Sequence, residues 1–107
     1  MPLCHRQLRR WYLDFNKRFH GNRLPHDLDV LYAPVEGYCA LTEWDENLED
    51  TDIVVTINPA FALDGRIAKI QLHHEMGHLG SGVCHHGEKF QAEIDRLYAL
   101  GAYKGLL

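Results

Sequence analysis

Cysteine is scarce in this chain, and the few cysteines present are not arranged in pairs. The 107 residues include three, Cys4, Cys39 and Cys84, which lie far apart and form no C-x-x-C motif. An odd number with this spacing argues against a disulfide framework and against a zinc ribbon, and it is typical of proteins of the reducing cytoplasm. We therefore expect a cytoplasmic protein without disulfides.

Long apolar runs and strong net charge are also missing. No run approaches the roughly 20 apolar residues of a membrane helix, and residues 1–6 lack the apolar stretch of a secretory signal. The net charge of -4 gives no general attraction to nucleic acids or anionic membranes. These absences disfavour a membrane protein and an electrostatically driven nucleic-acid binder.

The composition that remains is that of a compact globular protein. Hydrophobic residues make up 46% of the chain and charged residues 24%, which is ordinary for a folded domain and unlike a disordered segment. A length of 107 residues suits one domain over residues 1–107. The eight histidines are the unusual feature, because five of them lie within residues 73–86.

Hydrophobic periodicity predicts the helices. Four apolar residues recur at steps of three and four, which places them on one face of a first helix: Leu8, Tyr12, Phe15 and Phe19. Gly21 and Pro25 end this helix. Asp64 is the expected N-cap of a second helix from Gly65 to about Leu79, which Gly80–Gly82 terminates. A last helix is expected from Gly87 to Leu100.

Three short strands are expected between the first and second helices, over residues 29–33, 38–44 and 53–57. The third is the clearest, because Ile53–Ile57 is rich in β-branched residues. The acidic stretch 45–52 between the second and third strands is expected to be a loop. This order predicts an α+β fold with an N-terminal helix, a small three-stranded antiparallel or mixed sheet, an active-site helix and a C-terminal helix.

The motif with the clearest chemistry is H-E-x-x-H at His74–His78. Residues four apart share one face of a helix, so His74 and His78 can converge on one metal ion. Glu75 projects beside the pair and can take a proton from a water molecule that zinc has acidified. The preceding strand, 53–57, is expected to supply an edge where an extended peptide can pair. His73 points off this face and is not expected to bind the metal.

A third ligand is expected after the glycine bend, and the residues alone leave it open between His85 and His86. A metzincin-like pattern requires glycine at position 81 and histidine at position 84, but the chain has Ser81 and Cys84, so that pattern fails unless Cys84 binds zinc. An acidic ligand from the last helix, Glu88 or Glu93, is a further alternative, although Glu93 is more simply a solvated or capping residue.

The arrangement of these motifs resembles the SprT-like zinc metallopeptidases. Their H-E-x-x-H is followed by a variable loop and H-G-x-x-F, which corresponds here to His86–Phe90. The stretch Phe15–Phe19 with Leu24–Pro25, and the strands around Gly37–Ala40 and Ile53–Asn58, also look like that family. The resemblance implies a minimal zincin-like domain without a zinc ribbon. It further implies zinc ligands His74, His78 and His86, with Glu75 as general base.

The expected function is therefore zinc-dependent hydrolysis of peptide bonds in a protein or peptide substrate. One alternative is a zinc hydrolase of another substrate, such as RNA, and another is a non-catalytic, zinc-stabilised binding module. Only three good ligands are visible, which leaves a position open for water and favours catalysis. The basic residues of the first helix are interpreted as its solvated side, with phosphate contact as the weaker alternative: Arg6, Arg9, Arg10, Lys17 and Arg18.

Overall fold

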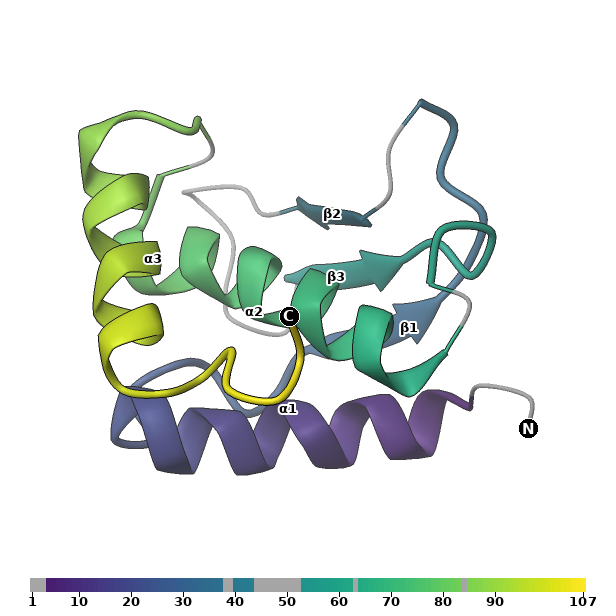
Figure 1. Cartoon of the computed structure of the whole chain (residues 1–107). Helices are drawn as coiled ribbons and strands as arrows, with labels where there is room; N and C mark the ends of the chain where they lie inside the picture. Colours follow the sequence, from purple (N-terminus) through teal and green to yellow (C-terminus); the bar gives the residue numbers. More distant parts are fainter. Residues whose placement is uncertain (1–3, 38–39, 44–52, 63, 84) are drawn as a thin grey trace.

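The computed structural model describes residues 4–37, 40–43, 53–62, 64–83 and 85–107. Its elements follow the expected order: α1 (His5–His20), β1 (Asp29–Tyr32), β2 (Ala40–Glu43), β3 (Val54–Ile57), α2 (Gly65–Ser81) and α3 (Glu88–Ala99) (Figure 1). Three helices and a three-stranded sheet confirm the predicted α+β class. The ends of the strand predicted over 38–44, the predicted acidic loop and Cys84 lie outside the described residues.

The sheet is mixed, with the strand order β1-β3-β2. β1 runs parallel to β3, and β2 runs antiparallel to β3 with Thr42 opposite Val55. β3 is therefore paired on both sides within the described part of the chain. The prediction that residues 53–57 offer a free edge is wrong, because β1 and β2 occupy both sides of that strand. The strand that borders α2 at an edge of the sheet is β2.

The core lies where α1 and α2 meet one face of this sheet. α1 contacts both β1 and α2, and α3 packs against α2 (Figure 1). The predicted apolar face of α1 is buried, with Leu8 and Tyr12 fully inaccessible. The other large buried core side chains come mainly from β3 and from α2: Val55, Ile57, Leu72 and Met76. Burying these apolar side chains supplies the main free energy that holds the layers together.

The ends of α2 are fixed by local interactions that the sequence signals. The Asp64 carboxylate accepts a hydrogen bond from the Ile67 N–H at 2.9 Å, as expected of an N-cap. The helix continues to Ser81, two residues past the predicted end, and stops at Gly82. Gly82 adopts a left-handed conformation with φ 73°, and its N–H donates to the His78 carbonyl. This sharp end turns the chain back toward α3.

The helices carry no sign of a transmembrane segment. Within the described residues, none of them combines the length and the hydrophobicity that a membrane-spanning helix requires.

Candidate metal centre

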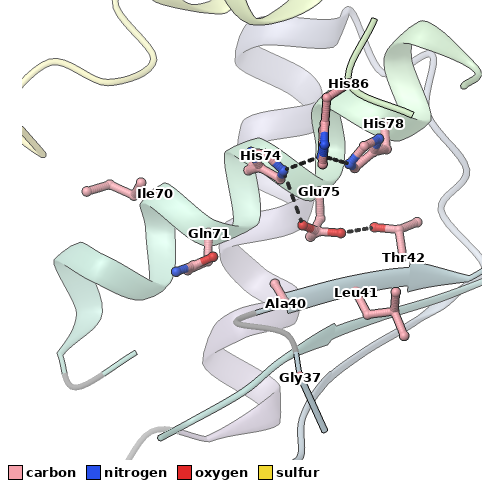
Figure 2. A pocket seen from close by; sticks show the side chains of 10 residues that line it. All are labelled: Gly37, Ala40, Leu41, Thr42, Ile70, Gln71, His74, Glu75, His78 and His86. Carbon is pink, nitrogen blue, oxygen red and sulfur yellow. Dashed lines mark hydrogen bonds and ion pairs between the residues drawn. The ribbon is translucent and has the colours of Figure 1, made fainter. Parts of the chain in front are cut away.

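Three histidine side chains converge beside the C-terminal half of α2 (Figure 2). His74 and His78 lie one helical turn apart on α2, and His86 comes from the segment that leads into α3. The Nε2 atom of His86 lies 3.2 Å from Nε2 of His74 and 3.2 Å from Nε2 of His78. One nitrogen atom from each of the three rings lies within 4.8 Å of the other two.

The separations of His86 from His74 and from His78 suit a tetrahedral metal ion. Bonds of 2.0–2.1 Å from zinc to imidazole place two nitrogen ligands about 3.4 Å apart at a tetrahedral angle. The two 3.2 Å separations fall close to that value. The group His74, His78 and His86 therefore lies close enough to bind a metal ion, and among the described residues the group contains only these three side chains.

The orientation of the His78 ring is set by a backbone carbonyl. Nδ1 of His78 lies 3.0 Å from the Val83 carbonyl oxygen, just beyond the end of α2. A carbonyl only accepts hydrogen bonds, so Nδ1 carries the proton and Nε2 presents its lone pair to the other two histidines. A metal-binding histidine is usually held in one tautomer by such a hydrogen bond from its other ring nitrogen, the one that does not bind the metal.

Phe90 of α3 contacts all three histidine rings. Its ring centroid lies 4.4 Å from that of His78, in a stacked arrangement, and 4.9 Å from those of both His74 and His86. The Phe90 side chain is buried at 4% exposure. This single aromatic ring therefore limits the movement of the three imidazoles, and it explains why a phenylalanine four residues after His86 belongs to the site.

Burial favours the form of His74 that binds metals. It lowers the pKa of His74 to about 4, and electrostatic repulsion between protonated imidazoles, from His78 and His86, acts in the same direction. The ring of His74 is therefore neutral at physiological pH, and only a neutral imidazole nitrogen can serve as a ligand.

Glu75 lies beside the histidine group and outside it. Its side chain is only 5% exposed. Oε1 accepts a hydrogen bond from the Thr42 hydroxyl at 2.8 Å, and Oε2 lies 3.9 Å from Nε2 of His74 (Figure 2). Burial raises the pKa of Glu75, while the Thr42 hydrogen bond and the charge of His86 oppose that rise. The carboxyl group thus sits where a base could act next to a metal ion.

The alternative third ligands that the structure describes lie apart from this group. His85 is exposed, and its Nδ1 accepts a hydrogen bond from the Gly87 N–H at 3.2 Å. Glu88 is exposed and does not join the group. The geometry therefore places His86, and not its neighbour His85, beside His74 and His78. Cys84 lies outside the described residues.

Two other candidates take part in the packing of the helices. Glu93 accepts a hydrogen bond from Arg96 and lies 3.8 Å from Nδ1 of His20, and its side chain is 14% exposed. Of the two roles that the sequence suggested, solvated or capping, the structure contradicts the solvated one, because Glu93 joins the polar network of Arg96 and His20 at the end of α1. His73 is fully buried and stacks on Phe15 with a centroid separation of 4.1 Å. His73 thus points away from the histidine group, as predicted.

A pocket of about 520 Å³ opens over the histidines between α2 and β2 (Figure 2). Besides the histidines and Glu75, its walls include Ala40, Leu41 and Thr42 of β2 and Ile70 and Gln71 of α2. The role of Thr42 had no counterpart in the sequence analysis. Strand alternation places residues 40 and 42 on one face, but nothing in the sequence says which helix that face meets.

No protein-family model, curated protein or solved structure matches this chain. A functional conclusion therefore depends on the chemistry of the site.

Proposed function

We propose that this protein is a zinc-dependent metallopeptidase in which His74, His78 and His86 hold the metal and Glu75 is the general base. The observation that carries the proposal is the convergence of three Nε2 atoms next to a buried carboxylate. Imidazole nitrogen suits zinc. Three protein ligands are typical of catalytic zinc sites, which leave one position for water or substrate, whereas structural sites are closed by four.

The roles of the side chains follow from their positions. The chemistry that zinc supplies when bound is Lewis acidity, which acidifies water and polarises a carbonyl oxygen. Glu75 Oε2, on the side of the carboxylate that faces His74, accepts a proton from the attacking water. As the C–N bond of the peptide breaks, the Glu75 carboxyl group returns this proton to the leaving amine nitrogen.

A peptide substrate is favoured by the strand that borders the pocket. β2 is an edge strand among the described residues, and three of its residues line the pocket next to the histidines. An edge strand has free N–H and C=O groups that can pair with an extended chain. A peptide lying along β2 would pass close to Glu75 and the metal ligands. This arrangement favours peptide hydrolysis over hydrolysis of RNA.

The same motifs support a family assignment as part of the proposal. H-E-x-x-H at His74–His78 and H-G-x-x-F at His86–Phe90 resemble the SprT-like metallopeptidases. The contacts of Phe90 with all three histidines give this second motif a physical function. We also propose a cytoplasmic location, which the exposed, unpaired thiol of Cys4 supports.

The test is the substitution Glu75→Gln, measured together with zinc content. We expect about one zinc per chain by elemental analysis in both the parent and the variant, because Glu75 is not a ligand. Hydrolysis of labelled casein and of a quenched fluorescent peptide library should fall by about 10²-fold or more, the usual contribution of a general base. The amide of glutamine cannot accept the proton.

Asp14→Asn is the matched control, because it also replaces a carboxylate by an amide. Asp14 is exposed on α1 and pairs with Arg18 of the same helix, so zinc content and hydrolysis should be unchanged. Normal hydrolysis by Glu75→Gln would contradict the proposed mechanism. Full zinc loading without hydrolysis by the parent would instead favour the zinc-stabilised binding module.

A further inference from the structure

Glu75 has two carboxylate oxygens in different surroundings. Oε1 faces the sheet and accepts a hydrogen bond from Thr42 Oγ1 at 2.8 Å, while Oε2 faces His74 Nε2 at 3.9 Å (Figure 2). The side chain is almost fully buried. A glutamate has three rotatable side-chain bonds, and a broad terminal torsion allows its carboxylate to turn. The bond of Oε1 to Thr42 and the approach of Oε2 to His74 thus distinguish the two oxygens.

The hydroxyl that makes this bond comes from the edge strand of the sheet. Thr42 is opposite Val55 in the β2–β3 register, and Val55 is fully buried on the face that packs against the helices. Side chains alternate along a strand, so Thr42 points to the same face, and its neighbour Leu41 points to the other. Thr42 therefore reaches Glu75 from across the pocket, 33 residues away along the chain.

We propose that Thr42 is a positioning residue that holds the Glu75 carboxylate with Oε2 turned toward the histidine group. The hydroxyl donates to Oε1, so this oxygen is occupied and the other stays available for the proton that the reaction moves. The kinetic part of this inference rests on the proposed peptidase function. The orientation itself is a property of the folded chain.

Thr42 belongs to a strand that also lines the pocket. A change in the register or position of β2 would move the hydroxyl and the free edge together, because a strand shifts as a unit. The group that orients the base and the strand that would pair with a peptide are therefore coupled.

Two substitutions separate the hydroxyl from the rest of the side chain. Thr42→Val keeps the β-branched shape that suits a strand and removes the donor, whereas Thr42→Ser keeps the donor and removes the methyl group. In Thr42→Val we expect kcat for a quenched fluorescent peptide to fall about 10- to 100-fold, the effect of losing a hydrogen bond to a charged group. KM and zinc content should stay near parental values. Thr42→Ser should recover most of kcat.

Thr56→Val of β3 is the matched control. Thr56 is opposite Leu41 in the register and so lies on the face of the sheet that points away from Glu75. Its substitution should leave kcat and KM unchanged. Parental kcat in Thr42→Val would overturn the proposal. An equal loss in Thr42→Ser and Thr42→Val would also overturn it, because it would show that packing of the methyl group matters and not the hydroxyl.

A second measurement does not require activity. The ¹³C resonance of the Glu75 carboxyl carbon, assigned by its loss in Glu75→Gln, should shift in zinc-free Thr42→Val and stay in place in Thr42→Ser. An unchanged resonance in Thr42→Val would overturn the proposal. A shifted resonance in a protein that hydrolyses no peptide would uphold the orientation by Thr42 and would contradict the proposed peptidase function instead.

Discussion

At the scale of single residues, the candidate site depends on how each ring is held. His78 is fixed by the Val83 carbonyl, and the Phe90 ring packs against all three imidazoles. These contacts restrict the rings before any ion binds. The side chains therefore lose less conformational entropy when the metal binds. The pairing of Glu75 with Thr42 does the same for the carboxylate.

His85 and His86 should differ in their contribution to zinc affinity. We expect His86→Ala to weaken zinc binding by more than about 100-fold. Replacing a residue that only hydrogen-bonds to a metal ligand already lowers metal affinity about 10- to 100-fold, and His86 is itself a proposed ligand. His85→Ala should leave zinc affinity unchanged, because the His85 ring bonds to the Gly87 N–H and lies outside the histidine group. Competition with a chromophoric chelator gives both affinities.

The pair of variants also serves as its own control. Each removes one exposed imidazole from the same segment, so general effects on the loop before α3 are matched. A larger loss of zinc in His85→Ala than in His86→Ala would show that the ligand assignment is wrong by one residue.

At the scale of elements, the close packing of α2 and α3 brings Phe90 to the histidines. Gly77 lies on the α2 face that meets α3, between Glu75 and His78. A Cβ atom at this position would lie 2.8 Å from Cδ1 of Ile94 and 3.2 Å from Cε2 of Phe90. The helices can approach this closely only because residue 77 has no side chain.

Gly77→Ala is therefore expected to weaken zinc binding through the packing of α3. Alanine improves helix propensity by about 1 kcal/mol, and overpacking opposes this by about 1–3 kcal/mol. The end of Ile94 can move away, but the buried Phe90 ring must shift relative to His78. We expect a small loss in the free energy of unfolding of the zinc-free protein and a clear loss of zinc affinity, measured by urea unfolding and chelator competition.

Gly80→Ala is the control on the same helix. It has the same change in propensity, but the three atoms nearest to its Cβ would belong to the Glu93 side chain, at 3.0–3.4 Å, and not to Phe90. Zinc affinity should be retained there. Equal zinc affinity in the two alanine variants would contradict the role given to Gly77.

At the scale of the whole molecule, a partly buried polar cluster joins α1 to α3. His20, at the end of α1, is 1% exposed, and its Nδ1 lies 3.2 Å from an Arg96 nitrogen. Arg96 also donates to the Phe19 carbonyl and to Glu93. An arginine only donates, so Nδ1 of His20 accepts, and the neutral ring carries its proton on Nε2.

This cluster predicts that acid destabilises the fold. Burial, followed by the charge of Arg96, lowers the pKa of His20 from 6.5 to about 4. Between these values the unfolded chain binds a proton that the folded protein does not, so stability is lost as the pH falls from 6.5 toward 4 and is fully present above 6.5. The difference between the two pKa values corresponds to a loss of about 3 kcal/mol in the free energy of unfolding. Urea unfolding of the zinc-free protein at pH 7.5 and 4.5 measures it.

The variant His20→Asn isolates this contribution. Asparagine keeps an acceptor for Arg96 but does not titrate, so the difference in unfolding free energy between the two pH values should shrink by up to about 3 kcal/mol. Replacing the exposed His26 by Asn should leave that difference unchanged. A pH dependence identical in parent and His20→Asn would show that His20 does not cause the loss.

The sequence by itself determined the features that depend on neighbours along the chain. The apolar face of α1, the Asp64 cap of α2, and the placement of His74 and His78 on one helix face were predicted and confirmed. Helix geometry fixes such relations, because residues four apart must share a face whatever the rest of the molecule does. The α+β class followed from the order of these elements.

Only the tertiary structure decided which distant groups meet. It placed β3 in the centre of the sheet and set Thr42 against Glu75. It also brought His86 to the α2 histidines, as the H-G-x-x-F resemblance implied, where the residues alone had left the choice open between His85 and His86. A shift of one residue in a loop or a strand register exchanges the side chain that points inward, and local sequence patterns do not fix that shift. Packing of the whole core does, because the observed register puts Thr42 on the face where Val55 and Ile57 are buried against the helices.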